Sequence, residues 1–258
     1  MTHYHTTTIV RLYRGFRLVL HLLYGLFIAA TFLGYLSPEN RDKIISHWSR
    51  GLIGIFNIDF MVHGIQPNWQ TRNTLFVANH ISWFDIYALN SIRAVRFIAK
   101  LDIRSWPVLG WFVEKGNTLF VDRGKRTEAG RMLDVTIRAL ENGDLLAFFP
   151  EGTTTDGTHL LPFKASLIQA AINTKATVWP VAIQYLDHNG KIDTNMGYYG
   201  DMSLAGSMAI MLTINKPVLV LTYLEPLVFN ERMTRTELAT LTRHKIQDQL
   251  NIKAKLKH

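Results

Sequence analysis

The stretch Leu75-Phe-Val-Ala-Asn-His-Ile-Ser-Trp-Phe-Asp85 decides the fold, because it contains the end of one element and the start of the next. Its apolar opening is typical of a buried strand, and Ser82-x-x-Asp85 has the spacing of a helix capping box. From about residue 58 onward, short apolar runs alternate with amphipathic stretches. This alternation predicts an α/β domain with a single mixed, largely parallel sheet flanked by helices.

The individual elements follow from these runs. We expect strands at Phe60–Val62, Thr74–Asn79, Val95–Ala99, Thr118–Val121, Leu145–Phe149, Thr177–Gln184 and Val218–Tyr223. We expect helices at Asp85–Ser91, Glu128–Asn142, Pro162–Thr174 and Thr234–Asn251. No internal repeat or Gly/Ser-rich linker interrupts this region. Residues 58–258 are therefore predicted to form one domain of the size of a catalytic domain.

Residues 1–57 are predicted to form a membrane-associated element of two helices. Leu18–Leu36 contains no charged residue, and as a helix it would reach roughly 28 Å, enough to cross a hydrocarbon core. Arg11, Arg14 and Arg17 precede it, which favours a cytoplasmic N-terminus. A signal peptide and a buried core helix are the alternatives.

The second helix of this element is expected over Arg41–Phe56, where apolar residues recur at helical spacing opposite a polar face. Two placements are open for it. It either lies in the membrane interface with Trp48 as an anchor, or it packs on the domain.

The composition excludes several classes of protein. Hydrophobic residues make up 48% of the chain and charged residues 19%, which excludes intrinsic disorder. Cys is 0, which excludes a disulfide scaffold and cysteine chemistry. The net charge of +8 favours an anionic partner, whether nucleic acid, an anionic lipid surface or a phosphorylated substrate.

His80 and Asp85 are candidates for a catalytic pair. His80 falls on the turn after the strand, so the chain can fold back and bring the Asp85 carboxylate to the imidazole. A carboxylate on one ring nitrogen fixes the tautomer and stabilises the imidazolium, which leaves the other nitrogen as a general base. The alternative is that Asp85 only caps the helix and that His80 is an incidental turn residue.

Two further strand ends carry polar residues. Arg123 follows one strand within a basic turn, and Glu151 follows another beside Pro150 and Gly152. Ligands of open α/β sheets bind outside the carboxyl ends of the strands, so His80, Arg123 and Glu151 are expected to face one crevice. Solvated turns are the alternative for both new residues.

Together these residues resemble the glycerolipid acyltransferase family, which includes the 1-acylglycerol-3-phosphate acyltransferases. The family block N-H-x-x-x-x-D is matched by Asn79–Asp85, and F-P-E-G-T is matched letter for letter by Phe149–Thr153. The block G-x-x-F-[IV]-x-R is similar to Leu119–Arg123, with Gly116 one residue further upstream. A proline within an apolar strand, the fourth block, is matched by Pro180.

The resemblance implies transfer of a fatty acyl group from a thioester to the hydroxyl of a lysolipid. His80 would be the base and Asp85 would orient it, without an acyl-enzyme. Substrate-binding roles are implied for Arg123, Glu151, Gly152, Thr153 and Lys164, and supporting roles for Asn79, Ser82 and Pro180. The donor would be acyl-CoA or acyl-carrier protein, with no cofactor and no metal. The apolar stretch Trp106–Phe112 is expected either in the core or along an acyl-chain tunnel.

Two departures from the family pattern keep the acceptor open. Thr154-Thr155 follows the F-P-E-G-T block where phosphate-acceptor enzymes commonly carry Arg or a Ser pair, and Ala165-Ser166 replaces the end of a family-like F-K-x-G. The favoured acceptor is 1-acylglycerol-3-phosphate, giving phosphatidic acid. Another lysolipid, such as lyso-ornithine lipid, is the alternative.

The same resemblance bears on localisation and on rival functions. Because the acyl donors are cytosolic, we expect the two N-terminal helices to enter and leave the cytoplasmic leaflet of the inner membrane as a hairpin, in contact with membrane lipids. An inactive lipid-binding protein is the rival from another class. A nucleic-acid partner is disfavoured because no recognition motif is present. Absence of G-x-S-x-G and H-E-x-x-H disfavours a serine hydrolase and a zinc enzyme.

Overall fold

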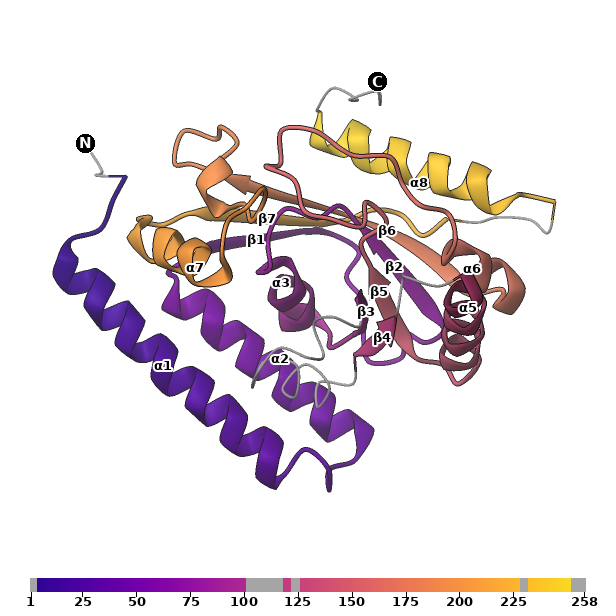
Figure 1. Ribbon diagram of the computed structural model, residues 1–258, viewed down its shortest axis with the longest axis horizontal. Helices are drawn as coiled ribbons and strands as arrows, with labels where there is room; N and C mark the ends of the chain where they lie inside the picture. The colour runs from indigo at the N-terminus through magenta and orange to yellow at the C-terminus, as the bar shows by residue number, and fades with distance from the viewer. Residues whose placement is uncertain (1–3, 101–117, 122–125, 228–231, 252–258) are drawn as a thin grey trace.

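The computed structural model describes residues 4–100, 118–121, 126–227 and 232–251, and these form one sheet with helices on both faces (Figure 1). Within the described residues the sheet has seven strands in the order β1-β7-β6-β2-β5-β3-β4. Their bounds are β1 Asp59–Gly64, β2 Thr74–Ala78, β3 Arg96–Lys100, β4 Leu119–Val121, β5 Leu145–Phe148, β6 Thr177–Leu186 and β7 Val218–Tyr223. Every predicted strand is present, with ends that differ by only a residue or two.

The sheet is mixed and mostly parallel, as predicted. Strands β6, β2, β5, β3 and β4 run in one direction, because each neighbouring pair among them is parallel. β7 pairs antiparallel with β6, and β1 is parallel to β7. The carboxyl ends of the five parallel strands therefore meet at one edge.

Helices cover both faces of this sheet. Their bounds are α1 Thr8–Thr31, α2 Pro38–Ile55, α3 Asp85–Ile92, α5 Arg126–Glu141, α6 Ile168–Thr174, α7 Leu204–Thr213 and α8 Arg235–Leu250. β2 shows why two cores form: Phe76 and Ala78 join the core under α2, α3 and α7, whereas Leu75 and Val77 join the core under α5, α6 and α8. Alternate residues of a strand point to opposite faces, so a strand that is apolar throughout serves both layers.

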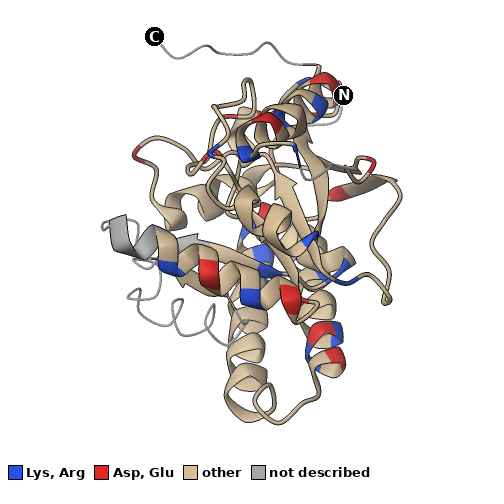
Figure 2. Ribbon diagram, turned by 90° about the vertical axis from the view of Figure 1, so that its right-hand side faces the viewer, with Lys and Arg blue, Asp and Glu red and all other residues tan. Residues whose placement is uncertain are grey.

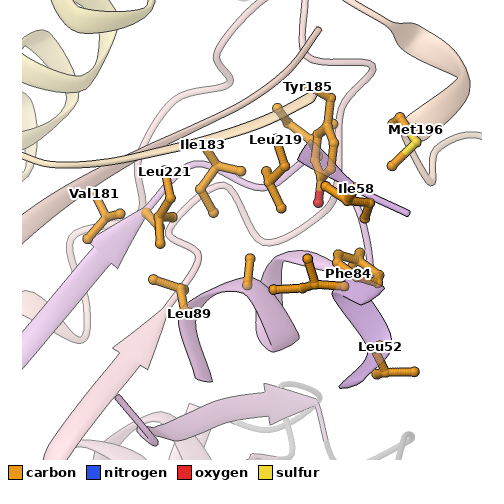
Figure 3. Packing of buried hydrophobic residues seen from close by; sticks show 14 of the residues in the cluster. Leu52, Ile58, Phe84, Leu89, Val181, Ile183, Tyr185, Met196, Leu219 and Leu221 are labelled. Atoms are coloured by element: carbon orange, nitrogen blue, oxygen red, sulfur yellow. The ribbon is translucent and has the colours of Figure 1, made fainter. Parts of the chain in front are cut away.

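The core between the sheet and α3 holds the start of this helix in place. Figure 3 shows side chains of β6 and β7, among them Ile183 and Leu221, pointing toward Phe84 and Leu89 of the α3 segment. Phe84 and Leu89 are essentially inaccessible to solvent. This packing fixes the start of α3 against the carboxyl edge of the sheet.

Two predicted helices start differently from the observed ones, and one observed helix was not predicted. α6 begins at Ile168 rather than at Pro162, because the preceding segment is tied to a neighbouring loop: Lys164 N donates to Pro150 O over 2.9 Å. α7 was not predicted, although Ser203 caps it through Gly206 N. α3 has Phe84 at its N-cap position and no side-chain cap, so the predicted Ser82 cap was wrong.

The N-terminal helix is longer than its charge-free segment. α1 begins at Thr8, capped by the Thr7 hydroxyl, so Arg11, Arg14 and Arg17 lie within it. Arg14 is buried, and its guanidinium donates to Ile214 O over 2.8 Å and to Leu212 O over 3.4 Å. Buried arginine thus fastens this helix to the end of α7.

α1 and α2 pack as an antiparallel pair through two glycines (Figure 1). His21 stacks on Trp48, whose indole N–H donates to His21 O while His21 Nε2 donates to Trp48 O. A Cβ on Gly25 would lie 2.5 Å from Trp48, and one on Gly51 would lie 2.4 Å from His21. Since Trp48 is buried, the packed placement of this second helix is the observed one, and Trp48 is no interfacial anchor.

On the side that Figure 2 presents, the described residues show charges of both signs. Figure 2 shows acidic and basic residues interleaved along the helices on the side it presents. At the start of α2, Lys43 Nζ lies 2.7 Å from Glu39 Oε1, one helical turn away. Because this pair is exposed, solvent and salt screen it, and it adds little to the stability of the fold.

Candidate active site

His80 and Asp85 meet at the carboxyl end of β2. The strand ends at Ala78, and the turn that follows brings His80 Nδ1 to 2.8 Å from Asp85 Oδ2. The Asp85 side chain is fully buried, whereas the His80 side chain retains 18% of its exposure. The pair is therefore closed on its carboxylate side and open on its imidazole side.

The turn is folded around the Asp85 carboxylate. Oδ2 also accepts the backbone N–H of Ile81 over 2.8 Å and that of Ser82 over 3.0 Å. Oδ1 accepts the hydroxyl of Tyr185, at the far end of β6, over 2.7 Å. A buried carboxylate is tolerated only when its oxygens are hydrogen-bonded, and this arrangement supplies those bonds.

The His80 ring is held in its plane by an aromatic neighbour. It stacks on Phe149, the first residue of the F-P-E-G-T block, with ring centroids 3.8 Å apart and an interplanar angle of 4°. Because Nδ1 donates to a carboxylate, the neutral ring carries its lone pair on Nε2. Within the described part of the chain, no group hydrogen-bonds to Nε2.

Glu151 binds the same turn from behind. Its Oε1 accepts the backbone N–H of His80 over 2.8 Å, and its Oε2 accepts that of Leu161 over 2.9 Å. Burial raises the pKa of Glu151 to about 7, and these two N–H groups act in the opposite direction. The observed contacts make Glu151 a clamp between two loops; its head-group role stays a prediction.

The residues after Glu151 form a loop that is hydrogen-bonded to the turn at His80. Gly152 has a φ of +78°, a conformation that glycine adopts without strain. Thr155 N donates to His80 O over 2.9 Å, which gives the turn a second anchor. The side chains of Thr153 and Lys164 are exposed, and their predicted contact with substrate remains a prediction.

Asn79 ties the turn to β6, the strand that contains Pro180. The Asn79 amide donates to Ile183 O over 2.9 Å and accepts from Ile183 N over 2.8 Å, so it continues the pairing where β2 has ended. Pro180 pairs with Val77, and its carbonyl accepts Leu224 N at the end of the β7 ladder. The missing N–H of Pro180 faces that ladder end, which is where a strand tolerates proline.

The structure thus brings together His80, Asp85, Glu151, Asn79 and the backbone of Ser82. Arg123 and the stretch Trp106–Phe112 lie outside the described residues. Among the described residues, no group of three or more His, Asp or Glu is arranged to hold a metal ion. The described residues of the site therefore provide one oriented imidazole, that of His80, at the edge of the sheet.

Sequence reasoning missed two members of this site. Tyr185 lies in the same apolar run as Pro180, and the only signal was that a buried tyrosine hydroxyl usually finds a partner. Phe149 was singled out as a letter of a motif, with no indication that it would stack on His80. Both contacts join segments that are far apart in the chain.

Known proteins share much of the sequence of this chain. The family model described as Acyltransferase matches residues 59–184. The chain is 35% identical over 179 residues to the 1-acyl-sn-glycerol-3-phosphate acyltransferase of Neisseria meningitidis, covering 69% of each chain. It is 32% identical over 200 residues to the lyso-ornithine lipid O-acyltransferase of Pseudomonas aeruginosa, covering 77% of this chain and 75% of that one.

A solved structure gives the same answer for the fold. The crystal structure of the 1-acyl-sn-glycerophosphate (LPA) acyltransferase PlsC from Thermotoga maritima superposes with a TM-score of 0.63 at 24% identity, covering 95% of this chain and 100% of that one. The protein is an α/β acyltransferase. It belongs to the family of the 1-acyl-sn-glycerol-3-phosphate acyltransferases, which confirms the resemblance inferred from its motifs.

Proposed function

We propose that this protein is a membrane-bound O-acyltransferase that moves a fatty acyl group from acyl-CoA or acyl-carrier protein to the free hydroxyl of a lysolipid. The observation that carries the proposal is the His80–Asp85 pair. Asp85 is buried and receives four hydrogen bonds, while the His80 side chain keeps 18% of its exposure and its Nε2 has no hydrogen-bond partner among the described residues. An alcohol is a poor nucleophile at neutral pH, and an oriented imidazole is the group that activates it.

The reaction proceeds in one ternary complex. His80 Nε2 takes the proton of the lysolipid hydroxyl as its oxygen attacks the thioester carbonyl carbon. The C–S bond then breaks, and the imidazolium returns the proton to the departing sulfur. The Asp85 carboxylate stabilises the imidazolium between these steps, as an aspartate does in hydrolytic triads.

The favoured acceptor is 1-acylglycerol-3-phosphate, with phosphatidic acid as the product. Relatives at 35% and 34% identity carry the name 1-acyl-sn-glycerol-3-phosphate acyltransferase. Lyso-ornithine lipid is the second candidate, since a Rhizobium meliloti enzyme named for it is 30% identical over 84% of this chain. Thr154 and Thr155, where a cation commonly follows the motif, favour this second reading.

A lysolipid panel tests the acceptor and the reaction together. Purified protein is given labelled acyl-CoA or acyl-carrier protein with lysophosphatidate, lyso-ornithine lipid or lysophosphatidylcholine in mixed micelles. We expect labelled phosphatidate as the main product and none from the His80→Ala variant. Faster acylation of lyso-ornithine lipid would reassign the acceptor, and transfer to none of the three would contradict the function.

The membrane placement is proposed from the outward face of α1. Large apolar side chains recur there, mostly three or four residues apart, and each is about half exposed or more. This outer stripe consists of Ile9, Leu12, Tyr13, Phe16, Val19, Leu20, Leu23, Tyr24 and Phe27. The opposite face, with Arg14, Leu18, Gly25 and Ala29, is buried against the rest of the protein.

One face bound to the domain and one bare apolar face are features of a helix that lies in the membrane surface. α1 is long and apolar enough to span a bilayer by composition, but Arg14 fastens it to α7 near the level of the sheet. We therefore propose that α1 lies along the cytoplasmic leaflet with the outer stripe among the acyl chains. His80 would then work at the surface where its acceptor resides and where cytosolic donors arrive.

The absence of cysteine makes this placement easy to test. Single cysteines are introduced at Asp248, exposed on α8, and at Phe16 in the outer stripe. In inverted inner-membrane vesicles, we expect an impermeant maleimide to label Asp248→Cys and to spare Phe16→Cys. Labelling of Asp248→Cys only in right-side-out vesicles would place the domain on the other side.

A further inference from the structure

The hydroxyl of Tyr185 makes a contact in this site to which neither the motifs nor the comparisons point. It donates to Oδ1 of Asp85 over 2.7 Å. The remaining donors, namely His80 Nδ1 and the backbone N–H groups of Ile81 and Ser82, all converge on Oδ2. Among the described residues, Tyr185 is thus the sole donor to Oδ1.

The length of β6 places Tyr185 there. β2 ends at Ala78, whereas β6 continues beyond that point, paired with β7. This overhang binds the turn twice: the main chain of Ile183 pairs with the Asn79 amide, and the Tyr185 hydroxyl reaches Asp85. The strand therefore acts as a fixed support for both ends of the His80 turn.

Solvent is excluded from the contact between Tyr185 and Asp85. The residue is 1% exposed and Asp85 is fully buried. Figure 3 shows the Tyr185 hydroxyl oxygen directed from β6 toward the α3 segment, with Ile58 close to the ring. A buried carboxylate oxygen without a donor is costly, so the loss of this one hydroxyl would leave Oδ1 unsatisfied.

We infer that Tyr185 is a positioning residue for acyl transfer, which holds the Asp85 carboxylate so that Oδ2 faces His80 Nδ1. The inference rests on the proposed function of His80 and Asp85. Burial, followed by the nearby Asp85 charge, raises the pKa of Tyr185 well above its ordinary value, so the hydroxyl stays protonated and donates throughout the working range. Tyr185 acts through Asp85 and does not contact the substrates.

The groups around the His80–Asp85 pair determine in which direction the pH dependence of activity should shift when Tyr185 is changed. The described titratable groups that act on it are Tyr185 on β6, Glu151 after β5 and, through Glu151, Arg243 on α8. When the Tyr185 donor is removed, the imidazolium becomes the main compensation for the buried Asp85 charge. The Asp85 carboxylate should then hold the imidazolium more strongly, and activity that needs neutral imidazole should be lost at a higher pH.

The test compares Tyr185→Phe, which keeps the ring, with Tyr223→Phe, a buried tyrosine of the same core that is not among the donors to Asp85. We expect kcat of Tyr185→Phe to fall roughly ten- to hundredfold, as for loss of a hydrogen bond to a charged group. Both KM values should stay within about twofold, and the acid limb of the kcat profile should move up by about half a unit or more. Tyr223→Phe should change none of these.

A second variant should shift the acid limb of the kcat profile in the opposite direction. If Tyr185→Phe fails to fold, 3-fluorotyrosine placed at position 185 strengthens the donor, and the acid limb should move down. Unchanged kcat with an unmoved acid limb in the folded Tyr185→Phe variant, or an unmoved limb with the fluorinated residue, would overturn the inference. A lower kcat at every pH without a shift would reduce Tyr185 to a packing residue.

The proposed function can fail independently. If His80→Ala turned over at the wild-type rate, the catalytic assignment itself would be wrong, whatever Tyr185→Phe does. If His80→Ala and Asp85→Asn were inactive but Tyr185→Phe behaved like the wild type, only the role of Tyr185 would be lost. In the Asp85→Asn background, Tyr185→Phe should cost much less than it does alone, because the two residues act as one unit.

Discussion

The turn around His80 and the outer stripe of α1 meet their surroundings in opposite ways. Asp85 is fully buried and accepts four hydrogen bonds. Phe16 and Leu23 on the stripe are 63% and 57% exposed. The turn is built from contacts between distant segments, whereas the stripe arises from the spacing of residues within a single helix.

This difference separates two requirements of the reaction. The base must be held rigidly, and buried hydrogen bonds to a charged group do that at high cost if one is missing. The acceptor is a lipid, so the protein must also lie on its membrane, and an apolar surface provides affinity without fixed geometry. Changes to the turn should therefore alter turnover, and changes to the stripe should alter membrane binding.

The largest effect is expected from Asp85→Asn. The amide cannot stabilise an imidazolium and presents the wrong hydrogen-bonding partner to Nδ1, so kcat should fall by about 10²–10⁴-fold. Acyl transfer by the variant in detergent micelles gives the measurement, with the exposed Asp201→Asn as the matched control. A rate within twofold of the wild type would mean that Asp85 only supports the turn.

The stripe is tested by the double variant Phe16→Ser/Leu23→Ser. Each side chain that no longer enters the bilayer should forfeit on the order of 1.5 kcal/mol, so vesicle affinity should fall more than tenfold. Flotation with anionic vesicles measures the affinity, and the control is Ile65→Ser, which changes an exposed apolar residue directly after β1. Turnover in micelles should hardly change; wild-type flotation would show that α1 is not the membrane contact.

Glu151→Gln should have a smaller effect, and one that depends on pH. An amide accepts only one of the two backbone N–H groups that the carboxyl binds, which should cost about 1–3 kcal/mol of stability. Burial gives Glu151 a folded-state pKa of about 7 against an ordinary value of 4.5. The folded chain therefore binds the extra proton between these values, and its stability should decline as the pH rises through this window.

Glu151→Gln lacks this titration. Its loss of stability relative to the wild type should therefore be larger at pH 5 than at pH 8. Thermal unfolding of Glu151→Gln and of the exposed control Glu225→Gln at both pH values tests the sign. A deficit that grows as the pH rises would show that Glu151 is ionised in the folded protein well below pH 7.

A loss of stability in the same range is expected from Gly51→Ala at the contact between α1 and α2. The new Cβ would lie 2.4 Å from His21 Cε1, so the helices must separate slightly, at a cost of about 1–3 kcal/mol. Gly54→Ala is the matched control, because nothing lies within 4 Å of a Cβ there. Thermal unfolding should distinguish the two variants; equal melting temperatures would mean that the pair is loosely packed.

Much of the fold could be predicted from the sequence because its signals are local. Apolar runs such as Thr74–Ala78 gave the strands, and β7 matches its predicted bounds at both ends. The start of α6 was misplaced because Leu161 and Lys164 give their backbone N–H groups to Glu151 and Pro150 rather than to a helical turn. Such contacts between distant segments do not alter the spacing of apolar residues from which helices are predicted.

The site was predictable to a similar extent. The spacing of His80 and Asp85 and the block around Glu151 indicated which residues gather at the sheet edge. The sequence did not indicate that Glu151 would bind the backbone of His80, that Phe149 would stack on its ring or that Tyr185 would reach Asp85. These contacts depend on the register of β2, β5 and β6, which only the folded sheet defines.

The most direct test of the account is acyl transfer by His80→Ala beside His188→Ala, an exposed histidine outside the site. Release of free thiol from the donor and labelled product from lysophosphatidate and lyso-ornithine lipid are followed together, with thermal unfolding as the check on folding. The account predicts that His80→Ala folds normally and loses at least about 10²–10⁴-fold in turnover, while His188→Ala is unaffected. Turnover by folded His80→Ala within twofold of the wild type would contradict it.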